Sequence, residues 1–284
     1  MSTPTPRQQL AAELRRLRDA AGLSTYRLAE LTKLSQSRVS RIETGKSIPR
    51  PGEITAWVRE CGATADEAAQ LSELATVAAR PSATPWRSSE PGGVVEAQER
   101  VGEREREAGT IRAFHPTGIY AGLLQTADFA RHMMELTGTP DVGAGTAARL
   151  NRQAVLYDPA KTFEFLLTEA ALYWRPGPPM MQVAQLAHIR QLMTLPNVTV
   201  GIIPSNVQAP TFFNEGFTVY EDRAEGDTSM VEVETVEGEQ TSTDPDVLAS
   251  YRKRLEQLRT VALYDDEARA LLDRVAEDLR RQQG

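Results

Sequence analysis

Hydrophobic positions in the first 80 residues recur with the period of a helix. Leu10, Leu14 and Leu17 lie at i, i+4 and i+7, Pro6 stands where a helix can begin, and Gly22 stands just past its end. Four further helical patterns follow, with apolar positions at Leu28, Ala29 and Leu31, at Val39 and Ile42, at Ile54, Trp57 and Val58, and at Ala68, Leu71, Leu74, Ala75 and Ala78. These patterns predict a compact all-α module of five short helices over residues 1–80.

The second and third of these helices are short and closely spaced. Ser24 and Ser35 stand at their N-cap positions, and Gly45 closes the third helix. Val39 and Ile42 of the third helix are predicted to point inward. Its polar side chains are predicted to point outward: Gln36, Ser37, Arg38, Ser40 and Arg41. Two helices that bury a small apolar face and expose a basic, polar one predict a helix-turn-helix for duplex DNA.

Beyond residue 80 the pattern becomes mixed. The Pro/Ser/Gly-rich segment 81–93 is interpreted as a linker. Residues 94–112 alternate in charge, which favours an exposed, solvated helix, with a dimer-facing or linker role as the alternative. Strands are predicted at 163–167, 198–203, 216–220 and 230–236, and helices at 125–136, 146–157, 180–193, 244–258 and 265–279. We therefore expect an α+β protein, with an α+β regulatory or dimerisation domain over 94–284 that has about four strands.

Composition excludes several classes of protein. With 40% hydrophobic and 25% charged residues the chain is of ordinary globular type. It has no apolar run of the roughly 18–20 residues that a membrane span needs, and MSTPTPRQQL has no apolar core of a secretory signal. The single cysteine, Cys61, excludes an internal disulfide and a Cys-based zinc cluster. We expect a cytoplasmic protein that associates with the nucleoid when it binds DNA and does not bind a membrane.

The net charge of −7 is divided unevenly along the chain. Residues 1–80 hold 12 basic and 9 acidic residues, a net of +3, which leaves 20 of the 32 basic and 30 of the 39 acidic residues, a net of −10, for 81–284. A basic module attracts phosphates, and an acidic remainder limits indiscriminate binding to nucleic acid. The charge therefore agrees with DNA binding by the first module.

Side chains at the start of the second helix of such a motif reach base edges. Gln36 is the best predicted base reader, since its amide can pair with adenine N6 and N7. Ser37 and Arg41 lie on the same side, and Arg41 could bind guanine or a phosphate. Three further side chains are predicted near phosphates: Thr25, Arg38 and Lys46. The alternative is that Arg38 and Arg41 are solvated charges on a helical bundle.

Residues 10–60 resemble the Xre, or lambda-repressor-like, helix-turn-helix family. The resemblance is carried by Gly22-Leu23-Ser24, Leu28-Ala29, Ser35 and Ser40-Arg41-Ile42-Glu43-Thr44-Gly45. It implies DNA contacts from Thr25, Gln36, Ser37, Arg41 and Lys46, and binding as a homodimer to an inverted-repeat operator. The family usually has Gln at the position of Thr25, so we expect a phosphate contact made by a shorter side chain. It usually has Gly at the position of Lys33, so we expect a non-glycine residue in a left-handed turn, with some strain.

The later part of the chain has a resemblance of its own. Ile111-Arg112-Ala113-Phe114, Gly122–Ala130, Leu195–Val200 and the helix with Tyr251, Leu255 and Leu258 are similar to the domain attached to many actinobacterial Xre-type regulators. These include WhiJ-like regulators of sporulation and antibiotic production. They are often paired with a small partner protein in an antitoxin-like arrangement. The resemblance implies no chemistry for particular residues.

Nothing in the second domain predicts catalysis. His115, His132 and His188 are scattered, and His188 is interpreted as a satisfied, partly buried histidine of an apolar helix. Glu232 and Glu234 alternate with valines, as on the solvated face of a sheet. Cys61 is interpreted as a small core residue in a helix rather than a redox sensor. We expect no enzyme activity, no cofactor and no metal site.

Three functions remain open. The first is a sequence-specific transcriptional regulator whose second domain dimerises and receives a signal, which could be a small-molecule effector. The second is the DNA-binding, antitoxin-like half of a two-protein system, in which that domain binds a small partner protein. The third is a catalytic domain tethered to DNA. Pro210, Phe212 and Phe213 suit a ligand pocket or a partner surface, although filling of the core explains them more simply.

Overall fold

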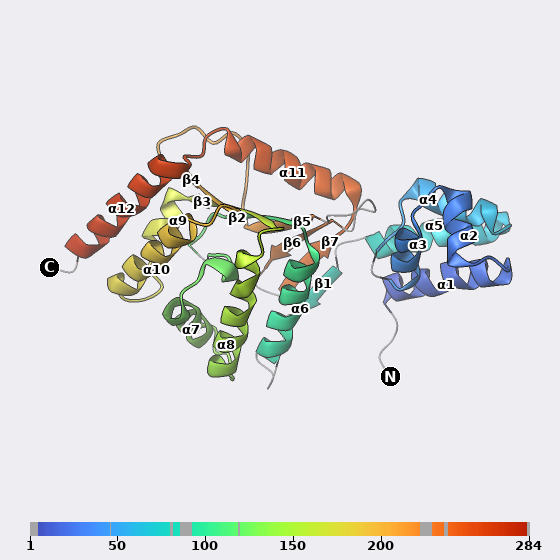
Figure 1. Cartoon of the computed structure of the whole chain (residues 1–284), viewed down its shortest axis with the longest axis horizontal. Coiled ribbons are helices and arrows are strands. Elements are labelled where there is room, and N and C mark those ends of the chain that lie inside the picture. Colours follow the sequence, from blue (N-terminus) through green and yellow to red (C-terminus); the bar gives the residue numbers. More distant parts are fainter. Residues whose placement is uncertain are drawn as a thin grey trace. The chain divides into compact units, whose positions relative to one another are not determined.

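The computed structural model describes residues 5–45, 47–79, 82–85, 93–118, 120–221, 229–235 and 238–282. The chain divides into two compact units (Figure 1). The first unit contains five helices from the N-terminal part of the chain, and the second contains a mixed sheet and further helices. The predicted α+β class is confirmed. The predicted domain limits of 1–80, 81–93 and 94–284 remain a prediction.

The helices of the first unit begin and end where local sequence signals place them. They are α1 (Pro6–Ala20), α2 (Thr25–Thr32), α3 (Gln36–Glu43), α4 (Pro51–Glu60) and α5 (Ala65–Ala79). The hydroxyls of Ser24 and Ser35 accept hydrogen bonds of 3.1 Å from the N–H groups of Arg27 and Arg38, so both predicted N-caps are confirmed. Gly45, just past α3, has φ +71°, which explains why glycine stands there.

The core of the first unit surrounds Trp57, whose side chain is fully buried. Its indole N–H donates to the carbonyl of Leu14 at 3.2 Å, so the one polar atom of this ring is satisfied inside the core. Apolar positions from all five helices complete the core, among them Leu10, Leu28, Val39, Ile42, Ile54 and Leu71. Cys61 lies at the C-cap of α4, not within the helix, and packs against this cluster as predicted. Burial raises the pKa of its thiol to about 11.

The second unit is built on a seven-stranded sheet of order β1-β7-β6-β5-β2-β3-β4. The strands are β1 (Ser82–Pro85), β2 (Thr110–His115), β3 (Thr162–Thr168), β4 (Val198–Ile203), β5 (Phe217–Glu221), β6 (Met230–Glu234) and β7 (Gly238–Ser242). The helices are α6 (Gly93–Glu107), α7 (Ala127–Leu136), α8 (Val142–Arg152), α9 (Glu169–Tyr173), α10 (Pro179–Leu192), α11 (Pro245–Arg259) and α12 (Asp265–Arg281), with 3₁₀ turns η1 (Gly122–Leu124) and η2 (Gln153–Tyr157). β2, β3 and β4 are parallel, and β5 is antiparallel to β2.

The expectation of about four strands was too low. The four predicted runs correspond to β3, β4, β5 and β6, whereas β1, β2 and β7 were not predicted. β1 and β7, with the sequences SATP and GEQTS, are polar and contain none of the hydrophobic alternation that marks a half-buried strand. β2 begins three residues after α6 ends, and part of it was assigned to the preceding charged segment.

Charged side chains lie on both faces of this sheet. In Figure 1, α6 and α8 lie on one face and α11 on the other. On the α11 side, Arg259 bonds to Glu164 of β3, and Arg252 bonds to Glu221 of β5 at 2.8 Å. Phe163 and Phe165 of β3 point to the opposite face, and both are fully buried. The register pairs Phe163 with Ile111 and Val198, which makes this face apolar around β3.

The charged helix over 94–112 was predicted to have a solvated face, and this is only partly confirmed: Glu96, Glu99, Glu103, Arg106 and Glu107 are exposed, but other polar residues of the helix are not. α6 ends at Glu107, and both Gln98 and Glu105 on it are buried. Glu232 was placed on a solvated sheet face, yet it is only 4% exposed and pairs with Arg104 of α6. Charge alternation identifies a helix but does not show whether its partners are water or other charged elements.

Two of the remaining expectations were met in part. His188 is partly buried as predicted, and burial lowers its pKa, but its Nε2 has no hydrogen-bond partner among the described residues. Phe213 is partly buried and packs edge-on against the core residue Phe114 with ring centroids 4.8 Å apart, whereas the adjacent Phe212 is 76% exposed.

Candidate DNA interface

The connection between α2 and α3 fixes the angle between the two helices. Lys33 has φ 58° and ψ 28°, the left-handed conformation expected for this turn. The N–H of Leu34 then returns to the carbonyl of Ala29 at 3.0 Å and closes the end of α2. A non-glycine residue in this conformation carries some strain, which the hydrogen bond and the packing of Leu34 against the core offset.

Arg38 was predicted to face outward and neutralise the DNA backbone, and the structure contradicts this. Its side chain is 4% exposed and lies between α3 and the start of α4. Nη2 and Nε bond to the Glu53 carboxylate at 2.7 and 3.2 Å. Further bonds reach the hydroxyl of Ser47 and the carbonyl of Ile48. A buried guanidinium held by this many acceptors is a structural element and cannot reach DNA while the domain is folded.

A second buried ion pair holds the other end of α3. Arg18 of α1 bonds to Glu43 through Nε at 2.5 Å and Nη2 at 2.9 Å, and its Nη1 reaches the carbonyl of Leu23 at 2.7 Å. The hydrogen bond to Glu43 raises the pKa of Arg18. Sequence reasoning missed this pair, although the sequence contained a signal for it: Arg18 lies four residues after Leu14, on the apolar side of α1.

With Arg38 turned inward, the exposed face of α3 is smaller than predicted. Gln36 and Ser37 at its start are exposed, and Ser40 and Arg41 are partly buried. The hydroxyls of Ser37 and Ser35 lie 3.0 Å apart and share a hydrogen bond. Gln36 therefore retains the position of a base reader, at the first residue of the helix.

The start of α2 lies in the same motif. Thr25, its first residue, is partly buried, and the helix N-terminus there favours an anion such as a phosphate. Tyr26, the next residue, is 76% exposed, and sequence reasoning had not singled it out. A large aromatic ring left in water is the signal that marks it. Lys46, predicted near the backbone of DNA, lies outside the described residues.

Two family models match separate parts of the chain. Residues 98–274, well over half of the chain, match a family model described as a domain of unknown function, DUF5753. The chain belongs to the DUF5753 family. Residues 9–71 of this DUF5753 protein match the model of a helix-turn-helix domain. A helix-turn-helix is a DNA-binding module, so the second match supports a DNA-binding regulator of transcription.

Other comparisons add less about this DUF5753 protein. No protein with a curated description matches the chain. Among solved structures, the crystal structure of the clp gene regulator ClgR from C. glutamicum is similar, at 26% identity and a TM-score of 0.23. That match covers 26% of this chain and 92% of the other. No helix among the described residues has the length and apolar character to cross a membrane. The actinobacterial and WhiJ-like parts of the resemblance stay predictions.

Proposed function

We propose that the chain is a sequence-specific transcriptional regulator that inserts α3 into the major groove of duplex DNA. The observation that carries the proposal is the orientation of α3. Its apolar side chains and Arg38 are buried, whereas Gln36 and Ser37 at its N-terminus are exposed. The ion pairs Arg18–Glu43 and Arg38–Glu53 hold this helix to α1 and α4. A rigidly held helix with exposed polar side chains at its start is the arrangement that reads base edges.

Within this proposal, Gln36 reads a base and Ser37 and Ser40 line the same face. Arg41 binds guanine or a phosphate, and Thr25 and Lys46 bind phosphates. Arg38 positions the helix and makes no DNA contact. The protein acts in the cytoplasm, bound to the nucleoid.

One helix-turn-helix buries little DNA surface, so we propose that the chain binds as a homodimer to an inverted repeat. The second unit then supplies dimerisation and receives the signal. The antitoxin-like alternative assigns that unit to a small partner protein. The 76% exposed Phe212 favours it, because a large apolar ring in a loop suits a protein surface. Pull-down of a specific partner that releases the chain from DNA would favour the alternative.

Selection of bound duplexes from a random DNA pool by the full-length chain tests the proposal. We expect enrichment of an inverted repeat whose half-sites are about one helical turn apart, roughly 10–10.5 base pairs. A pool without any enriched sequence after repeated rounds would contradict sequence-specific binding. Enrichment of single, unpaired half-sites bound tightly by a monomer would contradict the dimer.

A further inference from the structure

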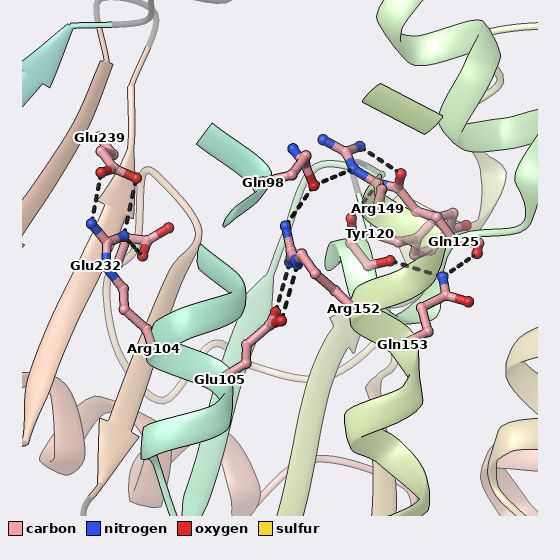
Figure 2. Close-up of polar contacts among 11 residues, drawn as sticks. Gln98, Arg104, Glu105, Tyr120, Gln125, Arg149, Arg152, Gln153, Glu232 and Glu239 are labelled. Carbon is pink, nitrogen blue, oxygen red and sulfur yellow. Dashed lines mark hydrogen bonds and ion pairs between the residues drawn. The ribbon is translucent and has the colours of Figure 1, made fainter. Parts of the chain in front are cut away.

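A cluster of polar side chains lies between α6, η1 and α8 in the second unit (Figure 2). We call it the α6–α8 arginine cluster, and it consists of Gln98, Glu105, Gln125, Arg149 and Arg152. The oxygen of Gln98 accepts from both arginines, from Arg149 Nε at 3.2 Å and Arg152 Nη1 at 2.6 Å. The two guanidinium groups therefore lie close together, where burial and mutual repulsion both disfavour their charge.

The positive charges of Arg149 and Arg152 have different partners. Arg152 forms a bidentate pair with Glu105, at 3.0 Å through Nε and 2.6 Å through Nη2. Arg149 bonds only to amide oxygens, those of Gln98 at 3.2 Å and Gln125 at 2.8 Å, and within the described residues no carboxylate lies within 4.0 Å of it. Burial, followed by the charge of Arg152, lowers the pKa of Arg149 to about 10. A guanidinium in this setting lacks the anion that normally accompanies it.

Neighbouring groups fix the orientation of Arg149. Gln125 donates through its side-chain nitrogen to the carbonyl of Tyr120 at 2.7 Å, so its side-chain oxygen is the atom left to face the guanidinium. Gln153, the first residue of η2 directly after α8, donates to the backbone carbonyl of Gln125 at 2.7 Å and to that of Gly122 at 3.1 Å, which ties the end of α8 to η1 (Figure 2). Arg149 is thus held in one direction by neutral groups, as a preorganised anion ligand would be.

Two donors of the cluster are open. Among the residues that the structure describes, neither Nη2 of Arg149 nor the side-chain nitrogen of Gln98 has a hydrogen-bond partner. Arg149 is only partly buried, so solvent reaches it. Glu234, on β6, acts on Arg149 by charge, which favours the protonated guanidinium, but among the described residues the two groups form no ion pair. The two donors are therefore available to a ligand.

We propose that Arg149 and Gln98 bind the carboxylate or phosphate group of a small anionic ligand. The planar guanidinium and the neighbouring amide N–H group present converging donors, which suits the oxygens of either anion. The ligand supplies the negative charge that Arg149 lacks, while the Arg152–Glu105 pair stays intact. This inference rests on the proposed sensing role of the second unit and specifies the chemistry of its signal, but binding can be measured without DNA.

The test is calorimetric titration of the full-length protein with inorganic phosphate and with glutarate, each at constant ionic strength against a chloride blank. We expect saturable one-site binding of at least one of the two anions. Arg149→Lys keeps the charge but removes the planar fork, and should raise the Kd by about tenfold or more. The matched control is Arg131→Lys, an exposed arginine of α7, which should leave the Kd unchanged.

Gln98→Met is the second variant, for the case in which Arg149→Lys does not fold. It should also weaken binding of the anion. The proposal is overturned if neither anion binds the wild type, or if a folded Arg149→Lys or Gln98→Met variant binds as tightly as the wild type. These outcomes are separate from DNA binding. A chain that binds the anion but selects no DNA sequence would contradict the proposed function while it leaves the anion site standing.

Discussion

The substitution Arg38→Ala tests whether Arg38 stabilises the first unit or contacts DNA. The substitution leaves the Glu53 carboxylate, 14% exposed, without its guanidinium partner. Breaking a buried pair costs about 3–5 kcal/mol, and the lower end applies here because Glu53 keeps a bond of 2.7 Å from the Arg50 N–H. In a unit of this size, roughly 3 kcal/mol lowers Tm by about 12–24 °C.

The assay is differential scanning calorimetry of the full-length chain, with hydrogen exchange of α3 to assign the transition to the first unit. Arg59→Ala is the control, because Arg59 is exposed and, among the described residues, pairs with its neighbour Glu60 alone, so it should change stability by less than about 1 kcal/mol. At a temperature where Arg38→Ala is folded, the slope of log affinity against log salt should match that of the wild type. An unchanged Tm together with a shallower salt slope would refute the assignment.

Three further predictions concern separate groups. Lys46→Ala should weaken binding to all DNA sequences alike and reduce the salt slope by about one, and a loss confined to one sequence would contradict this. Cys61 should react slowly with iodoacetamide at pH 7 because its pKa is about 11, and should react faster as the pH is raised, whereas the rate of a free thiol at pH 7 would show that it is not packed. Burial raises the pKa of Glu232 from 4.5 to about 7, so the folded state keeps a proton that the unfolded state releases, and stability should fall as pH rises through that window. Denaturant unfolding at pH 5 and pH 7.5 should show this fall in the wild type and a smaller one in Glu232→Gln, and equal falls would contradict it.

The first unit was predictable because its local signals are strong. Pro6, Ser24, Ser35 and Gly45 mark helix ends by mechanisms that need only neighbouring residues. The spacing of Leu10, Leu14 and Leu17 predicts the buried face of the first helix. What failed was the outward orientation of Arg38, since an arginine beside apolar positions points inward when an acidic residue 15 positions later, Glu53, meets it.

The second unit was less predictable because long-range charge pairing decides its structure. The charge alternation of α6 is typical of a solvated face. In the folded chain, however, Arg104 pairs with Glu232, 128 residues later, and Glu105 pairs with Arg152. Polar strands such as β7 carry no hydrophobic alternation, so nothing local distinguishes them from loops. The α6–α8 arginine cluster likewise depends on residues from three separate elements. Pattern reasoning along one sequence does not bring them together.

Whether Gln36 reads a base from the start of α3 is tested most directly by repeating the DNA selection with Gln36→Ala. Loss of a bidentate amide–adenine pair should flatten the preference at one base pair of each half-site by about 1–3 kcal/mol. The other positions of the inverted repeat should keep their preferences. An unchanged motif, or an equal loss of affinity for every sequence, would contradict the account.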